Sequence, residues 1–107
     1  MQASPPYGLP PHTLAVIISV LAQYPAIQSA IIYGSRAKGN YRPNSDIDLT
    51  LHAPGLSWQD QTRLEDALDD LLLPYKIDLS LYHQLTNPDL IAQIQQHGIV
   101  CYRASDK

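Results

Sequence analysis

The sequence predicts an α/β (α+β) fold, a small mixed sheet with helices packed on one face and aspartates on the other. Segments of helical periodicity follow short strand-like segments along the chain. Two of those strand-like segments, 46–51 and 75–82, alternate apolar and polar residues, so each has one face for a core and one open face. A chain of 107 residues can bury one core without disulfide or metal support, so we expect 1–107 to form a single domain.

The first helix is expected from Pro11 to about Gln23, after a proline-rich loose arm at 1–10. Its apolar residues follow the i, i+3, i+4, i+7 spacing of one buried face. Val16 and Val20 lie off that stripe and widen the apolar surface, which either the arm or a partner protein covers. The residues predicted to be buried are Leu14, Ile17, Ile18 and Leu21.

A Gly-Ser pair lies where the first strand, 30–33, ends and the chain turns. Glycine lets the backbone approach a ligand closely, and the following amides can point at an anion. A short helix over 35–38 then ends at Gly39, and 42–45 is a turn by composition. Three cations, Arg36, Lys38 and Arg42, lie in this stretch, either as a solvated loop or as local positive potential for a triphosphate.

The second strand carries two aspartates separated by one residue. Side chains alternate along a strand, so Asp46 and Asp48 project from the same face, close enough to share a cation. Ile47, Leu49 and Leu51 take the opposite, core-facing side.

A third helix follows Ser57, whose pairing with Asp60 three residues later is typical of a helix cap. Leu73-Pro74 ends this helix. Its predicted buried face consists of Leu64, Ala67, Leu68, Leu71 and Leu72. Its predicted solvated face, which is not a second site, consists of Arg63, Glu65, Asp66, Asp69 and Asp70.

The strand 75–82 repeats the alternation, with Lys76, Asp78 and Ser80 on its polar face. If it shares a sheet with 46–51, Asp78 shares the open face with the other aspartates; otherwise it faces water or pairs with Lys76. Beyond it, Asn87-Pro88-Asp89 caps a helix that Gly98 ends. Residues 99–102 form a closing strand or extended segment, and 103–107 a frayed tail.

Composition excludes several classes of protein. A net charge of −3 argues against a broad basic surface for nucleic acid, so no direct nucleic-acid contact is expected. The longest apolar run, 14–22, is too short to cross a membrane, and no positive region precedes it as in a secretory signal. A lone Cys101 favours a reducing, cytoplasmic setting. The four histidines have no ligand-like spacing and none is assigned to a metal. His52, just past the second strand, could border the two aspartates, but a surface role is favoured.

Gly34-Ser35, ten intervening residues and Asp46-Ile47-Asp48 together resemble the catalytic motif of the DNA polymerase β-like nucleotidyltransferase superfamily. In its short length the chain resembles the minimal nucleotidyltransferases (MNT), which are antitoxins commonly paired with a helical HEPN toxin. This resemblance implies the polymerase β-like fold and a third metal-binding carboxylate on a later strand, for which Asp78 is the candidate.

The resemblance also implies a reaction, the transfer of AMP from ATP to a hydroxyl, such as a tyrosine of the HEPN toxin. Asp46, Asp48 and Asp78 would be catalytic and would hold Mg²⁺, the cation that carboxylate oxygens and phosphates suit. Gly34 and Ser35 would bind the phosphates, with Arg36 or Lys38 nearby. The alternative is a non-catalytic module that binds nucleotide, or that neutralises a HEPN protein by contact alone.

Overall fold

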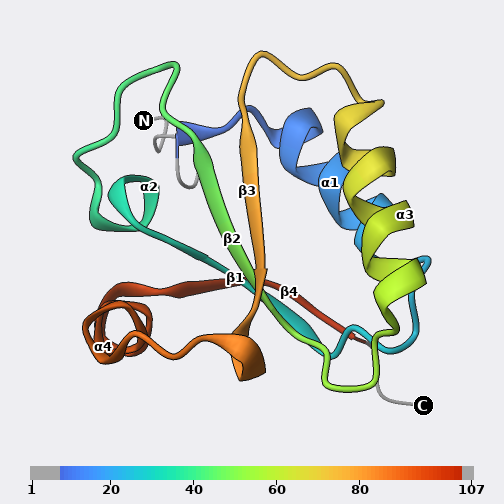
Figure 1. Cartoon of the computed structure of the whole chain (residues 1–107). Coiled ribbons are helices and arrows are strands. Elements are labelled where there is room, and N and C mark those ends of the chain that lie inside the picture. The colour runs from blue at the N-terminus through green and yellow to red at the C-terminus, as the bar shows by residue number, and fades with distance from the viewer. Residues whose placement is uncertain (1–7, 105–107) are drawn as a thin grey trace.

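The computed structural model of the protein describes residues 8–104, in which a four-stranded mixed sheet separates two groups of helices (Figure 1). The sheet order is β3-β2-β1-β4. β1 runs antiparallel to both β2 and β4, whereas β2 and β3 are parallel. The predicted α/β class is therefore confirmed. In chain order the elements are α1 (Pro11–Leu21), β1 (Ser29–Tyr33), α2 (Ser35–Lys38), β2 (Ile47–His52), α3 (Trp58–Asp69), β3 (Ile77–Leu81), the 3₁₀ turn η2 (Tyr82–Gln84), α4 (Pro88–His97) and β4 (Ile99–Arg103).

The main core lies between the sheet and the pair α1 and α3, which Figure 1 shows side by side on one face. The alternation predicted for β2 is confirmed, because Ile47, Leu49 and Leu51 are all buried. Burying these side chains removes apolar surface from water, which is the main stabilising contribution to the fold. Other fully buried members of this core are Leu9, Ile17, Leu21, Ile27, Ala30, Ile32 and Leu64.

The buried face of α1 is rotated from the predicted one. Thr13 and Val20 are buried together with Ile17 and Leu21, whereas Ile18 is only half-buried. The prediction that Val20 lies off the buried stripe is therefore wrong. The spacing of the apolar residues fits either face, and packing against α3 and the sheet selects one. Residues 8–10 are also less loose than predicted, because Leu9 is 1% exposed; the rest of the predicted arm, 1–7, lies outside the described residues.

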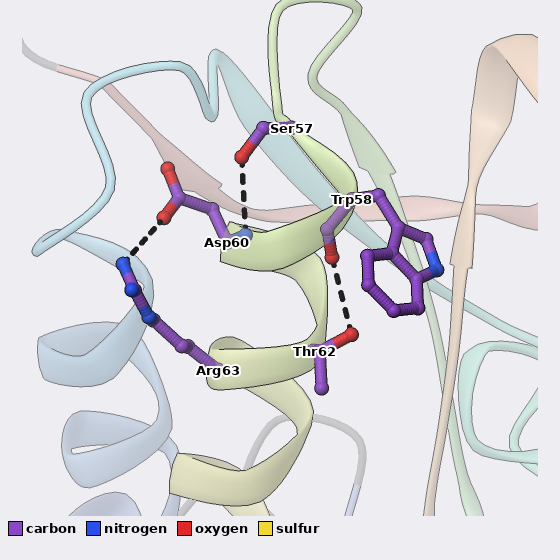
Figure 2. Close-up of polar contacts among 5 residues, drawn as sticks. All are labelled: Ser57, Trp58, Asp60, Thr62 and Arg63. Atoms are coloured by element: carbon purple, nitrogen blue, oxygen red, sulfur yellow. Dashed lines mark hydrogen bonds and ion pairs between the residues drawn. The ribbon is translucent and has the colours of Figure 1, made fainter.

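The predicted cap of α3 is confirmed: the Ser57 hydroxyl accepts a hydrogen bond from the backbone N–H of Asp60 at 3.1 Å (Figure 2). Leu64 and Leu68 are buried beneath it. Leu72, however, is 87% exposed and has a positive φ of 54°, so its predicted burial is wrong. The helix ends at Asp69, and the left-handed turn that follows directs Leu72 away from the core.

α4 lies on the opposite face of the sheet from α1 and α3 (Figure 1). Asn87 caps it by accepting hydrogen bonds from the N–H groups of Asp89 and Leu90, as predicted. Gly98 follows its last residue with a φ of −62°, which any residue can adopt. Glycine is needed there for space, because a Cβ would lie 2.7 Å from the Ile31 side chain and would also collide with the Ile94 carbonyl. Gly98 therefore allows α4 to approach β1.

The described part of the chain, 8–104, holds no helix with the length and apolar character needed to span a membrane.

Candidate active site

Two of the predicted aspartates lie side by side on the sheet. Asp48 of β2 pairs in register with Asp78 of the parallel strand β3. Paired residues on neighbouring strands point to the same face, and their backbones are about 4.8 Å apart. Because Leu49 is buried on the core face, Asp48 and Asp78 lie on the other face. The structure thus places both carboxylates on one face of the sheet, opposite the main core, as predicted. The same face also carries α4, because Gly98 at the end of that helix lies against Ile31, so the helices are not confined to the other face as predicted.

Asp46 lies just before β2 and is exposed. Its charge acts on Asp48, whose pKa is raised by burial first, then by the charges of Asp78 and Asp46. Neighbouring negative charges make ionisation of a carboxyl less favourable. We refer to Asp46, Asp48 and Asp78 as the aspartate group, because the charges of Asp46 and Asp78 both act on Asp48. No three acidic or histidine side chains among residues 8–104 are already gathered closely enough to hold a metal ion.

Gly34 lies directly against this group. It has a φ of +75° at the start of α2, and a Cβ at this position would collide with the Asp48 carboxylate. Both the backbone conformation and the space therefore require glycine. Ser35 is half-buried at the first position of α2, and its carbonyl accepts hydrogen bonds from the N–H groups of Gly39 and Asn40. The Gly-Ser turn and the aspartates are thus neighbours in the fold.

The two cations predicted to contact nucleotide differ in their surroundings. Lys38 is exposed in the last turn of α2. Arg36 is 2% exposed, and its guanidinium donates hydrogen bonds to the carbonyls of Pro43 and Ser45. A nucleotide contact through Nε or Nη2 would have to replace these hydrogen bonds, and the predicted contact of Arg36 with a nucleotide stays a prediction.

Tyr33 lies in one row across the sheet with Asp48 and Asp78, although it was not among the residues predicted from the sequence. It pairs with Asp48 across β1 and β2 and is 8% exposed. Its pKa is raised by burial, and further by the charges of Asp48 and Asp78. The Ser80 hydroxyl near the phenol acts in the opposite direction, but it is buried without a well-formed hydrogen bond. The signal was present in the alternation of β1, where Ala30 and Ile32 face the core and Tyr33 cannot.

Two other features of the sheet, the His52 ring and a hollow beside β3, do not include Asp48 or Gly34. His52, at the far end of β2, packs its ring against Tyr82 with centroids 4.6 Å apart. A hollow of about 310 Å³ between α3 and the edge strand β3 includes Asp78 in its wall, but not Asp48 or Gly34. Acidic residues of α3 line it, and their charge would repel a triphosphate. These lining residues are Glu65, Asp66 and Asp69.

Comparison with known proteins identifies the family to which the chain is similar. The sequence model of the family described as "Polymerase beta, Nucleotidyltransferase" matches residues 16–107. No curated protein matches the chain.

Three solved structures are similar in fold. A chain of a toxin–antitoxin complex with AMP-PNP is 25% identical, with a TM-score of 0.67; the match covers 85% of this chain and 73% of that one. A chain of the complex of a tri-AMPylated Shewanella oneidensis HEPN toxin with its MNT antitoxin is 21% identical, with a TM-score of 0.63 and coverage of 87% and 71%. A protein provisionally described as a minimal nucleotidyltransferase is 27% identical, with a TM-score of 0.60 and coverage of 82% and 88%.

Proposed function

This chain belongs to the Polymerase beta, Nucleotidyltransferase family, and we propose that it transfers AMP from ATP to a tyrosine hydroxyl of a helical HEPN partner and so acts as its antitoxin. Residues 1–107 would work as one nucleotidyltransferase domain, with Mg²⁺ as cofactor and the cytoplasm as the compartment.

The observation that carries this proposal is the alignment of Asp48 with Asp78 beside Gly34. The carboxylates stand in register on parallel strands, and the Gly34 backbone reaches the Asp48 carboxylate without an intervening side chain. A phosphate bound at the Gly-Ser turn would therefore lie next to acidic groups. Such proximity is unfavourable unless a cation lies between the charges, which is the arrangement that a metal-dependent phosphoryl-transfer site uses.

The donor set fits Mg²⁺. Asp46, Asp48 and Asp78 offer only hard carboxylate oxygens, and Mg²⁺ is typically held by a few carboxylates together with substrate phosphates. The pKa of Asp48 is raised first by burial and then by the charges of Asp78 and Asp46, and a bound cation would favour its ionised form. When bound, the metal would supply positive charge against the developing charge on the phosphoryl oxygens.

The remaining groups would orient the substrates. The backbone amides of Gly34 and Ser35, with the Ser35 hydroxyl, would hold the β- and γ-phosphates, and the exposed Lys38 could reach the same phosphates. Asp78 would accept the proton from the attacking hydroxyl. The acceptor oxygen then bonds to the α-phosphorus as the bond to the bridging oxygen breaks, and pyrophosphate leaves.

The relatives support the choice of nucleotide and acceptor. One similar structure holds AMP-PNP, an adenine nucleotide, and another contains a HEPN toxin that carries AMP groups beside its MNT antitoxin. A protein acceptor also fits the site, because Asp46 and Asp78 are exposed and so open to a partner.

The test is to incubate this chain with its HEPN partner, ATP and Mg²⁺, and to measure the intact mass of the partner. We expect mass steps of one adenylate unit, located on tyrosine by fragmentation and lost in the Asp48→Asn variant. Neutralisation of the partner with no change in its mass would contradict the proposal and favour the contact-only module.

A further inference from the structure

We propose that Arg36 is a positioning residue, which ties the Gly-Ser turn to the two segments that lead into the aspartate-bearing strands. Its place in the reaction rests on the proposed function, whereas the tie itself is a property of the fold. Two sets of contacts and the position of Arg36 itself carry the inference.

The first set joins Arg36 to the loop before Asp46. The Nε and Nη2 atoms donate to the Ser45 carbonyl at 3.2 and 2.9 Å, and Nη2 also donates to the Pro43 carbonyl at 3.2 Å. Ser45 immediately precedes Asp46, so these hydrogen bonds fix the peptide from which Asp46 extends. The Ser45 hydroxyl in turn accepts a hydrogen bond from the N–H of Arg42 at 2.7 Å, which closes the loop on itself.

The second set is a pair of aromatic rings. The Cζ atom of Arg36 lies 5.3 Å from the ring centroid of Tyr41 and 4.9 Å from that of Tyr75. Both distances allow a cation–π interaction, which is stronger when the cation is removed from water. Tyr75 lies in the segment that enters β3, where the Lys76 carbonyl accepts a hydrogen bond from the N–H of Ile47 at 2.8 Å. Arg36 therefore also contacts the chain leading to Asp78.

The third observation is the position of Arg36 itself. It is the second residue of α2, directly after Ser35, so its backbone belongs to the proposed phosphate turn. With 2% exposure, its charge is desolvated, and the carbonyls and rings around it provide the compensation. Arg36 thus links three parts of the chain. They are the proposed phosphate turn, the loop that precedes Asp46 and the segment that leads to Asp78.

Lysine could not replace this geometry. The planar guanidinium directs several N–H donors at fixed angles and stacks against rings, whereas an ammonium is a compact, strongly hydrated charge on a flexible stem. Loss of the tie should let Asp46 move relative to Gly34 and Asp48, while all the proposed metal ligands remain in the chain. Residues that orient metal ligands in this way typically contribute about 10- to 100-fold to metal affinity.

The experiment compares Arg36→Lys with Arg63→Lys, a matched control on the exposed face of α3, where Arg63 makes a surface ion pair with Asp60 at 3.4 Å (Figure 2). One measurement is amide hydrogen exchange over 40–46. The other is the Mg²⁺ concentration that gives half-maximal ATP binding. We expect Arg36→Lys to speed exchange over 40–46 and to raise the Mg²⁺ requirement by about 10-fold or more, with binding recovered at saturating Mg²⁺. Arg63→Lys should change neither quantity.

A pair of Tyr75 variants keeps the test decisive if Arg36→Lys does not fold. Tyr75→Phe retains the ring against the guanidinium, whereas Tyr75→Leu removes it, so only the second should shift the Mg²⁺ requirement and the exchange over 40–46. Wild-type values of both quantities in Arg36→Lys, or in a Tyr75→Leu that replaces it, would overturn the inference. If the wild-type chain binds no ATP at any Mg²⁺ concentration, the proposed function fails, and faster exchange over 40–46 alone would still establish the tie.

Discussion

Asp48 and Asp78 stand directly opposite each other in the parallel pairing of β2 and β3, and the pKa of Asp48 is raised by its burial and then by the charge of Asp78. Two carboxylates held on neighbouring strands without a compensating partner disfavour the folded state. The only ion pair among residues 8–104 joins Arg63 and Asp60, so the alternative in which Lys76 neutralises Asp78 is not observed.

The Asp48→Asn variant should be more stable than the wild type at pH 7 without metal. Because the folded-state pKa of Asp48 lies above its ordinary value of 3.8, the folded chain holds the proton more tightly than the unfolded chain. The free energy of unfolding therefore falls as pH rises from 3.8 through the raised pKa, and the deficit persists above it. Since Asp48 is partly exposed, we expect a gain of about 1 kcal/mol or less.

Thermal unfolding in a chelating buffer measures this effect. The gain of Asp48→Asn over the wild type should shrink as the pH is lowered from 7 towards the ordinary pKa of 3.8. Asp69→Asn, on the exposed face of α3, serves as the control. A gain that is constant with pH would show that the charge of Asp48 is not its source.

The Asp78→Asn variant should separate catalysis from folding. The substitution keeps the shape of the side chain, and removing one preorganised electrostatic group should cut AMP transfer by about 10² or more. Its metal-free thermal midpoint should not fall, because a repulsive charge is lost. Turnover and midpoint are measured with and without Mg²⁺. Normal transfer would remove Asp78 from the site and leave Asp46 and Asp48 as the metal ligands.

Mg²⁺ and ATP should bind together far better than either binds alone, because the cation lowers the repulsion between the triphosphate and the aspartates. Calorimetric titration of ATP with and without Mg²⁺ measures this coupling, and Asp48→Asn should weaken it while Asp69→Asn should not. ATP binding of equal strength without metal would contradict the role of the aspartates.

Gly34→Ala and Gly39→Ala form a matched pair. Both glycines have positive φ, +75° and +89°, so alanine strains the backbone at either position. Only at Gly34 does the new Cβ also meet the Asp48 carboxylate, whereas nothing lies within 4 Å at Gly39. We expect both variants to lose about 1–3 kcal/mol of stability from strain. Only Gly34→Ala should also lose Mg²⁺-dependent ATP binding; equal binding by both would show that the contact with Asp48 is unimportant.

Local patterns predicted much of the fold because they report local physics. The alternation in 46–51 placed Ile47 in the core and Asp48 outside it, and the caps at Ser57 and Asn87 marked helix starts. Where two faces of a helix were equally apolar, as around Val20, only tertiary packing decided between them. The exposure of Leu72 depended on where the helix ended, which periodicity does not specify.

The sequence predicted those site residues that are close in sequence or share a face of one strand. It did not predict the site residues that only the pairing of strands brings together. Tyr33 joins the row through its pairing with Asp48, and the registration of Asp48 with Asp78 likewise required the sheet. Arg36 was interpreted from its charge as a nucleotide contact, but its buried guanidinium lies against the ring of Tyr75, far along the chain. The sequence pattern contains no record of such long-range contacts.

The position of β1 in the sheet also has a consequence for how the chain folds. On one side β1 pairs with β2, which follows it closely in the sequence. On the other side β1 pairs with β4, and there Ser29 is the partner of Arg103, far along the chain. Closing such a long loop costs more entropy than closing a hairpin, and non-local pairings slow folding. On the ribosome, the β1–β2 hairpin and the Gly-Ser turn could therefore form early, while the free edge of β1 would have to wait for the last strand to emerge.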